Sequence, residues 1–405
     1  MVSSPVVPLL GHKRNIDFGK AAVQSYLNIH AIDGYYQIMK QQSTNLMIAV
    51  ALLASASVPS IAWAGAPRDA DGRFMNRYAD LSHSQNFLSW QWTRITEGLP
   101  KPARTPTPMM TPDSARLRQP QGLAQVTWIG HSSVLYQIDG RNFLFDPVYA
   151  EYASPVPPLG PKRAQPPGIP FGQLPHIDAV FISHNHYDHL DLETVRQLAQ
   201  QPGGAPVFYV PLGVDTWFAD HVAGTRIHGE QPNVIAMDWD ETQTFAGQRL
   251  PLTIRFLGVQ HWSARSPFDR NKTLWGSWAL EHPSFRFWFA GDLAYSADID
   301  DIARAHGGFD LAAIPIGVYE PRWFMKRAHI DPDEAILTFK KVGARKALGI
   351  HWGTFDGLSD ESLDEPPVAF NRSRQEAKVS ADDFMLFRIG ETRSFNGGSA
   401  IQSKK

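Results

Sequence analysis

The nine residues SHNHYDHLD, at positions 183–191, decide the fold of this chain. A continuous apolar run at 177–182 precedes them and predicts a buried strand. Apolar side chains then recur at helical spacing, at Leu190, Leu192, Val195 and Leu198. The sequence therefore predicts a buried strand that leads into a helix through a short turn crowded with ionisable side chains.

The composition of this turn predicts a metal site. His184 and His186 alternate at the strand end and project to the same side, while Asp188 and His189 fall on the tight turn that follows. Imidazole and carboxylate together favour Zn²⁺ among first-row ions, although Mn²⁺ and Fe remain open. A surface loop with scattered histidines is the alternative, but it gives no reason for so many ionisable groups directly after a buried strand.

The overall composition narrows the classes of function. The chain has 405 residues, of which 43% are hydrophobic, and its 38 Lys and Arg against 40 Asp and Glu give a formal charge of −2. We expect no nucleic-acid partner, because phosphate binding needs an excess of clustered cations. The absence of cysteine excludes disulfides, thiol nucleophiles and Cys-ligated zinc. Gly and Pro number 31 each, which suits short strands and tight turns in an α/β or α+β domain.

The N-terminal region contains the pattern of an export signal. Met39-Lys40 is followed by an apolar run at 46–58 and by the small-x-small sequence Ala62-Trp63-Ala64. This order is typical of a secretory signal over 39–64 that is cleaved before Gly65, so we expect a periplasmic or otherwise exported protein. We interpret Met39 as the true start and residues 1–38 as an extension of uncertain role. A membrane anchor over 46–64 is the alternative.

The rest of the chain divides into three parts. Closely spaced prolines at 102, 106, 108 and 112 predict an extended arm over 65–120, with one helix near 87–95. Short apolar runs around the turn Asp139-Gly140 then predict hairpins, and alternating strand-like and helix-like runs continue to about 396. We expect one domain over 121–396 and a loose polar tail over 397–405.

Several segments resemble the hydrolases of the metallo-β-lactamase fold, whose hallmark is the H-x-H-x-D-H turn at 184–189. Within this fold the sequence is most similar to the branch of the phospholipases D that hydrolyse N-acyl-phosphatidylethanolamine. The resemblance covers about 122–367 and is carried by WIGHSSVLYQIDGRNFLFDPV (128–148), GPKR (160–163), HIDAVFISHNHYDHLD (176–191), VPLG (210–213), QHW (260–262), LWGSW (274–278), FAGD (289–292), DLAAIPIGVYEPRWFMK (310–326) and IHWGTF (350–355). Leu293-Ala294 departs from the Thr-Gly that the family pattern has after the aspartate.

The resemblance implies a fold and a set of metal ligands. The fold would be an αββα sandwich, in the α/β class, with two mixed β-sheets flanked by helices. The remaining ligands would be His261, Asp292 and His351, each at the end of an apolar run. By resemblance, two Zn²⁺ ions per chain would bind, one to His184, His186 and His261, the other to Asp188, His189 and His351, with Asp292 bridging.

The chemistry implied by the resemblance is hydrolysis. Two metals would acidify a water, which Asp188 would orient for attack on phosphorus. His329 follows the EPRWFMK segment, and we expect it to contact the substrate phosphate or to protonate the leaving alkoxide. Arg322 and Lys326 are candidate contacts for a lipid phosphate and headgroup, although a surface cation–π cluster is an equal alternative for them. We expect His131 to support the ligands.

The predicted activity is a zinc-dependent phosphodiesterase of phospholipase D type. It would cleave N-acyl-phosphatidylethanolamine to N-acylethanolamine and phosphatidic acid, with peripheral contact to a membrane. The alternative within the fold is a lactonase or esterase that acts on a small molecule. A nuclease is disfavoured by the near-neutral charge of the chain. A non-enzymatic protein with purely structural metals is a further alternative, but it would need a closed coordination sphere. The oligomeric state stays open, with a homodimer as one option.

Overall fold

The computed structural model describes residues 65–78, 87–98, 102–225, 233–247 and 249–396. The predicted extension (1–38), signal segment (39–64) and tail (397–405) lie outside the described residues. The chain divides into two units, Met1–Ala62 and Trp63–Lys405, and all the described residues belong to the second. Among the described residues, no helix is both long enough and apolar enough to cross a membrane.

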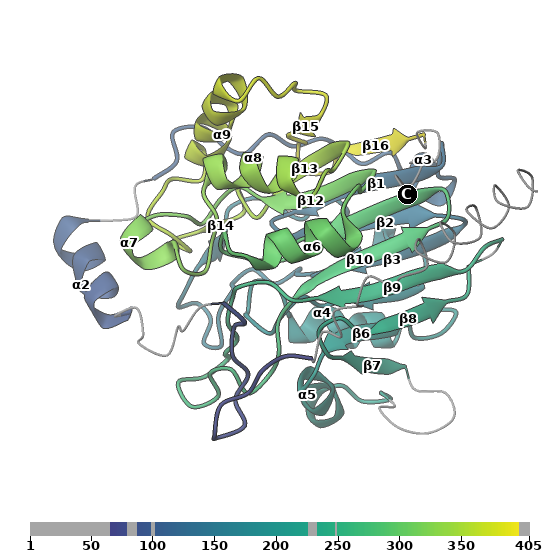
Figure 1. Ribbon diagram of the computed structural model, residues 1–405, viewed down its shortest axis with the longest axis horizontal. Coiled ribbons are helices and arrows are strands. Elements are labelled where there is room, and N and C mark those ends of the chain that lie inside the picture. Colours follow the sequence, from purple (N-terminus) through teal and green to yellow (C-terminus); the bar gives the residue numbers. More distant parts are fainter. Residues whose placement is uncertain (1–64, 79–86, 99–101, 226–232, 248, 397–405) are drawn as a thin grey trace, which may run out of the picture. The chain divides into compact units, whose positions relative to one another are not determined.

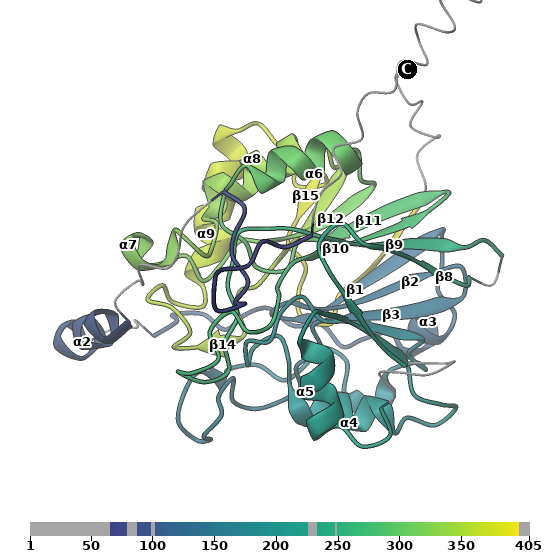
Figure 2. The same cartoon turned by 60° about the horizontal axis from the view of Figure 1, so that its bottom comes forward.

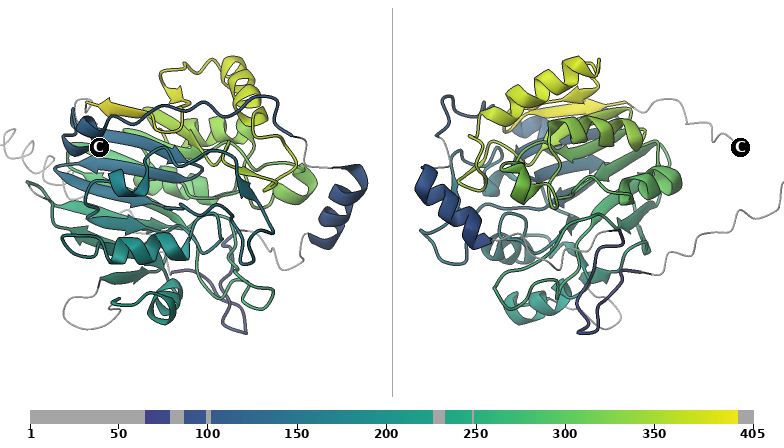
Figure 3. Two further views of the ribbon diagram at one scale, coloured as in Figure 1. Left: turned by 180° about the vertical axis from the view of Figure 1, so that it is seen from behind. Right: turned by 60° about the vertical axis from the view of Figure 1, so that its left-hand side comes forward.

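Two mixed sheets face one another and confirm the predicted sandwich (Figure 1). Within the described residues the first sheet has seven strands in the order β16-β1-β2-β3-β5-β6-β7. Their bounds are β16 Thr392–Phe395, β1 Ala124–Gly130, β2 Ser133–Ile138, β3 Arg141–Phe145, β5 Ala179–Phe181, β6 Val207–Pro211 and β7 Val234–Met237. The predicted hairpins form the antiparallel part of this sheet, and the strands from β3 to β7 run parallel. Seen from behind in Figure 3, β16 closes the edge beside β1.

The second sheet also has seven strands among the described residues, in the order β15-β13-β12-β11-β10-β9-β8. Their bounds are β15 Phe384–Met385, β13 Lys346–Ile350, β12 Leu311–Pro315, β11 Phe285–Phe289, β10 Ser277–His282, β9 Leu252–Leu257 and β8 Thr242–Phe245. A short ribbon of β4 (Lys162–Arg163) and β14 (Phe355–Asp356) lies apart from both sheets. Strands β11, β12 and β13 are parallel neighbours, so their carboxyl ends meet at one edge.

Helices cover the two outer faces (Figure 2). Helices α4 (Leu192–Ala199) and α5 (Val214–His221) lie on the first sheet, and α6 (Asp298–His306), α8 (Pro332–Lys341) and α9 (Glu365–Glu376) on the second. Three shorter or outlying helices are α2 (Phe87–Glu97), α3 (Ser114–Arg118) and α7 (Arg322–Met325), and a 3₁₀ turn spans Phe171–Gln173. The helix expected near 87–95 is thus α2, whereas α5 and α9 were not predicted from the sequence.

Aromatic side chains fill the space between the sheets. Phe145 of the first sheet stacks on Phe181 at 4.8 Å between ring centroids and meets Phe287 of the second sheet edge-on at 5.3 Å. The indole of Trp278 donates a hydrogen bond to the carbonyl of Ile182 at 2.9 Å, which links the second sheet to the first just before the histidine-rich turn. Ring pairs of this kind add to the hydrophobic stabilisation and fix the spacing of the two layers.

An unusual carboxyl group lies at the start of α6. Asp298 is 1% exposed, and its Oδ2 accepts a hydrogen bond from the Ser296 hydroxyl at 2.8 Å, while its Oδ1 has no partner. Burial is the largest cause that raises the pKa of Asp298 to about 6. Because the folded state holds this proton more tightly than the unfolded state, ionisation of Asp298 costs stability as the pH rises through its folded pKa.

We expect Asp298→Asn to stabilise the protein near neutral pH. The gain in the free energy of unfolding is about 2 kcal/mol, because the amide carries no charge that burial penalises. Below the pKa of an unfolded aspartate, about 4, the two proteins become equally stable. Denaturant titrations across this pH range measure the difference, with Asp333→Asn on the exposed first turn of α8 as the control. A gain that persists at acid pH would contradict this account.

Candidate metal centre

The histidine-rich turn is held between a buried strand and a capped helix. Strand β5 is buried throughout, and Asp191 caps α4 by accepting a hydrogen bond from the backbone of Glu193 at 3.2 Å. Within the turn, the amide of Leu190 donates to the carbonyl of His186 at 2.9 Å. The sequence folds this way because an apolar run must be buried, and the polar residues after it then emerge at the edge of the sheet.

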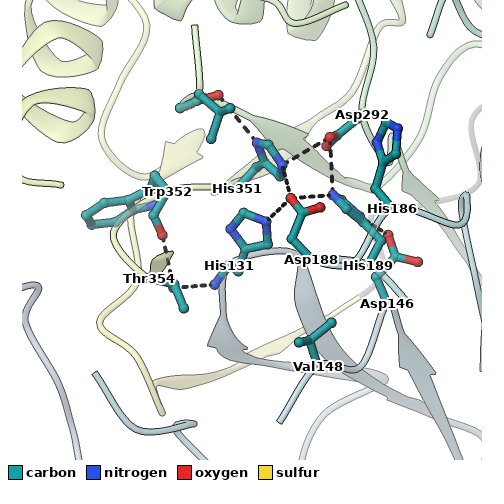
Figure 4. A network of polar contacts seen from close by, with 12 residues as sticks. His131, Asp146, Val148, His186, Asp188, His189, Asp292, His351, Trp352 and Thr354 are labelled. Carbon is teal, nitrogen blue, oxygen red and sulfur yellow. Dashed lines mark hydrogen bonds and ion pairs between the residues drawn. The ribbon is translucent and has the colours of Figure 1, made fainter. Parts of the chain in front are cut away.

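The second sheet supplies three further groups at the same edge. His261 comes after β9, Asp292 after β11 and His351 directly after β13. Figure 4 shows Asp292 and His351 meeting Asp188 and His189 from the turn. The structure therefore brings together the seven residues that the sequence analysis named as ligands.

Three imidazoles form the first group of ligand atoms. His184 Nε2 lies 2.8 Å from His186 Nδ1, which in turn lies 3.4 Å from His261 Nε2. These three residues form one of the groups whose ligand atoms all lie within 4.8 Å of one another. Three nitrogens at such separations can bind one cation at ordinary metal–nitrogen distances.

The second group surrounds the Asp188 carboxylate. Asp188 Oδ2 lies 3.4 Å from His189 Nε2 and 3.5 Å from His351 Nε2. Asp292 Oδ2 stands between the groups, at 3.0 Å from His351 Nε2 and 3.2 Å from His189 Nε2. The same oxygen is 3.9 Å from the Nε2 atoms of His184 and His261, so its position suits a ligand shared by both groups.

Four of the ligand imidazoles are held through the ring nitrogen that faces away from the centre. Their partners are Ser183 Oγ for His184 (2.9 Å), Asp146 Oδ2 for His189 (2.7 Å), the Ala328 carbonyl for His261 (2.9 Å) and the Gly317 carbonyl for His351 (3.4 Å). Such partners fix the tautomer and the ring orientation, so that the opposite nitrogen keeps its lone pair for a cation. This is the usual arrangement behind metal-binding histidines.

The electrostatics of the two groups differ. Burial is the main cause that lowers the pKa of His261 to about 4, and burial with neighbouring imidazoles also keeps His184 and His186 at a pKa well below the ordinary value. Burial also opposes a charge on His351, but the carboxylates of Asp292 and Asp188 outweigh it and raise the pKa of His351 to about 9. The second group thus needs positive charge beside its carboxylates, which a cation would supply.

Unpartnered buried atoms at this edge also fit bound cations. Asp292 Oδ1 is buried without a hydrogen-bond partner, and the buried Nε2 atoms of His189 and His351 face the carboxylates of Asp188 and Asp292 without a well-directed hydrogen bond. A buried polar atom without a partner costs free energy, so orphaned atoms that converge on one point usually face a ligand. The donor set of imidazole and carboxylate, without thiolate, is one that binds divalent transition metals.

Comparison with known proteins gives the same assignment. Residues 141–352, more than half of the chain, match the family model of the β-lactamase superfamily domain. The chain belongs to the β-lactamase superfamily. It is 41% identical over 241 residues to N-acyl-phosphatidylethanolamine-hydrolyzing phospholipase D 1 of Caenorhabditis elegans, covering 59% of this chain and 67% of the relative. It is 35% identical to the mitochondrial N-acyl-phosphatidylethanolamine-hydrolyzing phospholipase D of Saccharomyces cerevisiae, covering 59% of this chain and 49% of the relative.

A solved structure shares the fold. The isothiocyanate hydrolase from Delia radicum gut bacteria aligns with a TM-score of 0.51 at 18% identity, over 68% of this chain and all of that one. At this identity the likeness concerns the fold alone. Together with the cluster of histidines and aspartates, the comparisons identify the chain as a metal-dependent hydrolase of the β-lactamase fold.

His131 supports a ligand of the hydrolase from behind. Its Nε2 lies 2.9 Å from Asp188 Oδ2, and its ring packs against that of His351 at 4.2 Å between centroids. Burial is the largest cause that lowers the pKa of His131 to about 3, so the ring is neutral and donates this hydrogen bond. His131 and His351 both have left-handed backbones, with φ of 52° and 64°, which non-glycine residues rarely adopt outside functional sites.

The predicted substrate residues lie in different surroundings. His329 Nδ1 is buried without a partner and lies 3.7 Å from Asp292 Oδ2, so this ring borders the metal centre. Arg322 instead donates to the His329 carbonyl at 2.9 Å and pairs with Glu334 at 2.8 Å. It therefore holds the loop that carries His329. Lys326 is exposed.

Leu293-Ala294, the departure from the family pattern, leaves the ligand before it in place. Leu293 is fully buried and its carbonyl accepts a hydrogen bond from Ile330 at 2.9 Å, while the amide of Ala294 donates to the carbonyl of Gln260 at 2.8 Å. These two bonds tie the segment after Asp292 to the segments that carry His261 and His329. The larger apolar side chain thus packs in the core beneath the site.

Sequence reasoning missed three residues that organise this centre. Asp146 follows an apolar run, as the named ligands do, and this signal could have identified it. Asn76 lies in the N-terminal arm, where its side chain accepts from the amide of His261 at 3.0 Å and donates to the carbonyl of His261 at 2.9 Å. Glu361 lies in the loop before α9. No local pattern marks Asn76 or Glu361.

Glu361 fills a concave stretch of backbone behind His351. Its carboxylate accepts hydrogen bonds from three consecutive amides, those of Val318, Tyr319 and Glu320, the last at 3.0 Å. Val318 has a φ of 64°, a strained value for a β-branched residue. The preceding residue, Gly317, supplies the carbonyl that faces His351 Nδ1. Glu361 thus fixes the loop that orients a metal ligand.

Replacing Asp146 tests the support behind His189. We expect Asp146→Asn to weaken metal binding about 10- to 100-fold, because the carboxylate that orients the imidazole loses its charge. Competition with a chromophoric chelator measures the affinity. Asp178→Asn, which breaks a partly exposed pair with Arg141, is the matched control and should bind metal normally. Equal affinity of the two variants would refute this role for Asp146.

Replacing Glu361 tests the loop behind His351. We expect Glu361→Gln to lower kcat about 10-fold while the metal content stays unchanged, because one of the three amides then faces an NH₂ group. The visible spectrum of the Co²⁺-substituted protein should shift, since it reports the geometry of the ligands. Glu376→Gln, exposed at the end of α9, is the control. An unchanged spectrum and kcat would show that Glu361 has no part in the site.

Proposed function

We propose that this hydrolase is a zinc-dependent phosphodiesterase of phospholipase D type that cleaves N-acyl-phosphatidylethanolamine to N-acylethanolamine and phosphatidic acid. The observation that carries the proposal is the 41% identity to a relative named for this hydrolysis, over 67% of its length. The site is compatible with it, because it offers two groups of ligands that share Asp292. A donor set of histidine and aspartate without cysteine favours two Zn²⁺ ions over softer or purely oxygen-bound metals.

The protein's own residues then divide the work of the reaction. Zn²⁺ held by these ligands would supply an acidified water and a positive charge beside the phosphoryl group. Asp188, held by His131, is placed to orient the attacking water. His329 faces the same space, and burial keeps its pKa well below the ordinary value even though Asp292 acts in the opposite direction. A neutral His329 is suited to donate a hydrogen bond to a phosphate oxygen rather than to transfer a proton.

The surface near α7 supports a phospholipid substrate. Trp90 of α2 stacks on Phe324 of α7 at 4.6 Å, and this contact places the two helices side by side (Figure 1). Their exposed side chains include Trp92 (67% exposed), Ile95 (75%) and Trp323 (57%), and Lys326 and Arg327 are exposed beside them. Tryptophan with nearby cations is typical of surfaces that bind the headgroup region of a bilayer. We therefore place the peripheral membrane contact at these two helices.

Hydrolysis of N-acyl-phosphatidylethanolamine in vesicles by the zinc-loaded protein tests the proposal. We expect release of N-acylethanolamine, measured by mass spectrometry, and its loss in His184→Ala and Asp292→Ala, which each remove a ligand. His329→Ala should keep its zinc and lose about 100-fold in kcat, because it removes a hydrogen-bond donor to the phosphate oxygen. His176→Ala, at an exposed position before β5 and so at the other end of that strand from the histidine-rich turn, is the control.

Two further results of this experiment are decisive. Trp323→Ala should reduce hydrolysis of vesicles but leave a dispersed short-chain substrate unaffected, since only the former requires contact with a bilayer. If the zinc-loaded protein releases no N-acylethanolamine in either form of substrate, the phospholipase assignment is wrong. The substrate would then belong to the lactone or ester class.

A further inference from the structure

The main chain of Gly65 lies directly against the carboxylate of Asp238. The amide of the next residue, Ala66, donates to Asp238 Oδ1 at 2.8 Å. A Cβ atom on residue 65 would stand 2.5 Å from Asp238 Oδ2 and 3.1 Å from Cγ, closer than any side chain allows. Any other residue here would displace the Asp238 carboxylate, and the φ of 28° at Gly65 is also in the region that favours glycine.

Asp238 has no cationic partner among the residues that the structure describes. Its Oδ1 accepts from the amide of Trp239 at 2.7 Å as well as from Ala66, and its own amide donates to Glu241 Oε2 at 2.9 Å. Asp240, two residues on, pairs with Arg77. The turn after β7 thus presents three carboxylates, Asp238, Asp240 and Glu241, and the ion pair of Arg77 in this turn is with Asp240. A cation beside Asp238 Oδ2 would be stabilised.

Gly65 is also the residue before which the sequence predicts cleavage, because Ala62-Trp63-Ala64 has the small-x-small pattern. We propose that the mature chain begins at Gly65 and that its new α-ammonium group forms an ion pair with Asp238. Hydrolysis of the Ala64–Gly65 amide by a host leader peptidase adds the elements of water. The hydroxyl goes to the Ala64 carboxyl group, and the Gly65 amine takes up protons to become an ammonium group below a pKa of about 8.

The ion pair would anchor a segment that reaches the metal centre. Residues 65–78 run from Asp238 to Asn76, whose side chain bonds both the amide and the carbonyl of His261. Cleavage would therefore create a positive charge at Gly65. Its ion pair with Asp238 would hold the segment whose Asn76 supports the predicted ligand His261. This inference does not depend on the phospholipase assignment, and activity is not used to test it.

The first test is N-terminal sequencing of the protein purified from cells that express the full chain. Gly65 at the terminus supports the proposal. Met1, Met39 or any other first residue overturns it.

The second test compares the thermal stability of the chain that begins at Gly65 with that of the same chain carrying two extra N-terminal residues. We expect the Gly65 form to melt about 2 °C higher near neutral pH, because only its ammonium can reach Asp238. The ion pair raises the folded pKa of this amine above its unfolded value, so the difference is full below pH about 8 and disappears as the pH rises through the folded pKa.

The control removes the partner of the ammonium. In Asp238→Asn the two forms should melt together at every pH. Because this variant also alters the bond to Ala66, a second control acetylates the α-amine of the Gly65 form, which removes the charge and keeps Asp238. A stability difference that survives acetylation, or that is equal at neutral and alkaline pH, overturns the ion pair.

Discussion

The outward hydrogen bond of each supported imidazole is the constraint on which the site depends. When one ring nitrogen of a histidine is held by a hydrogen bond, the tautomer and the orientation of the ring are fixed. The lone pair of the other nitrogen then points in one direction only, toward the metal centre. Ser183, Asp146 and the carbonyls of Ala328 and Gly317 impose this orientation on four rings that come from three different segments. The sandwich is the scaffold that brings these partners to one edge.

Backbone strain accompanies this geometry. His131, Asp146, Val318 and His351 all have positive φ values, and all four touch a metal ligand or the loop behind one. Such conformations persist only where surrounding contacts hold them, and here the contacts are hydrogen bonds such as that from the amide of His351 to the carbonyl of His131 at 2.9 Å. The rigid core between the sheets keeps these strained turns in place.

The composition and the apolar runs predicted an α/β or α+β domain, because buried strands are apolar and the residues after them are not, and the family resemblance added the αββα sandwich. The family resemblance identified Asp292 and His351 as ligands, and their positions at the ends of apolar runs agree with the same rule. Glu361 and Asn76 could not be found in this way, since their roles come from the amides they meet far along the chain. The role of Arg322 was equally hidden: its guanidinium is held by Glu334 and by the carbonyl of His329, which no local pattern indicates.

The ligands divide between the two sheets, and this has a consequence for folding. The turn after β5 supplies His184 and His189, while the second sheet supplies His261 and His351, so a cation held by either group of ligands would join both layers across long stretches of chain. A metal that binds only the folded state adds RT ln(1 + [M]/Kd) to the free energy of unfolding. The thermal stability of this hydrolase is therefore expected to rise with the logarithm of the free metal concentration. The packing of its two layers would then depend on how much metal its surroundings contain.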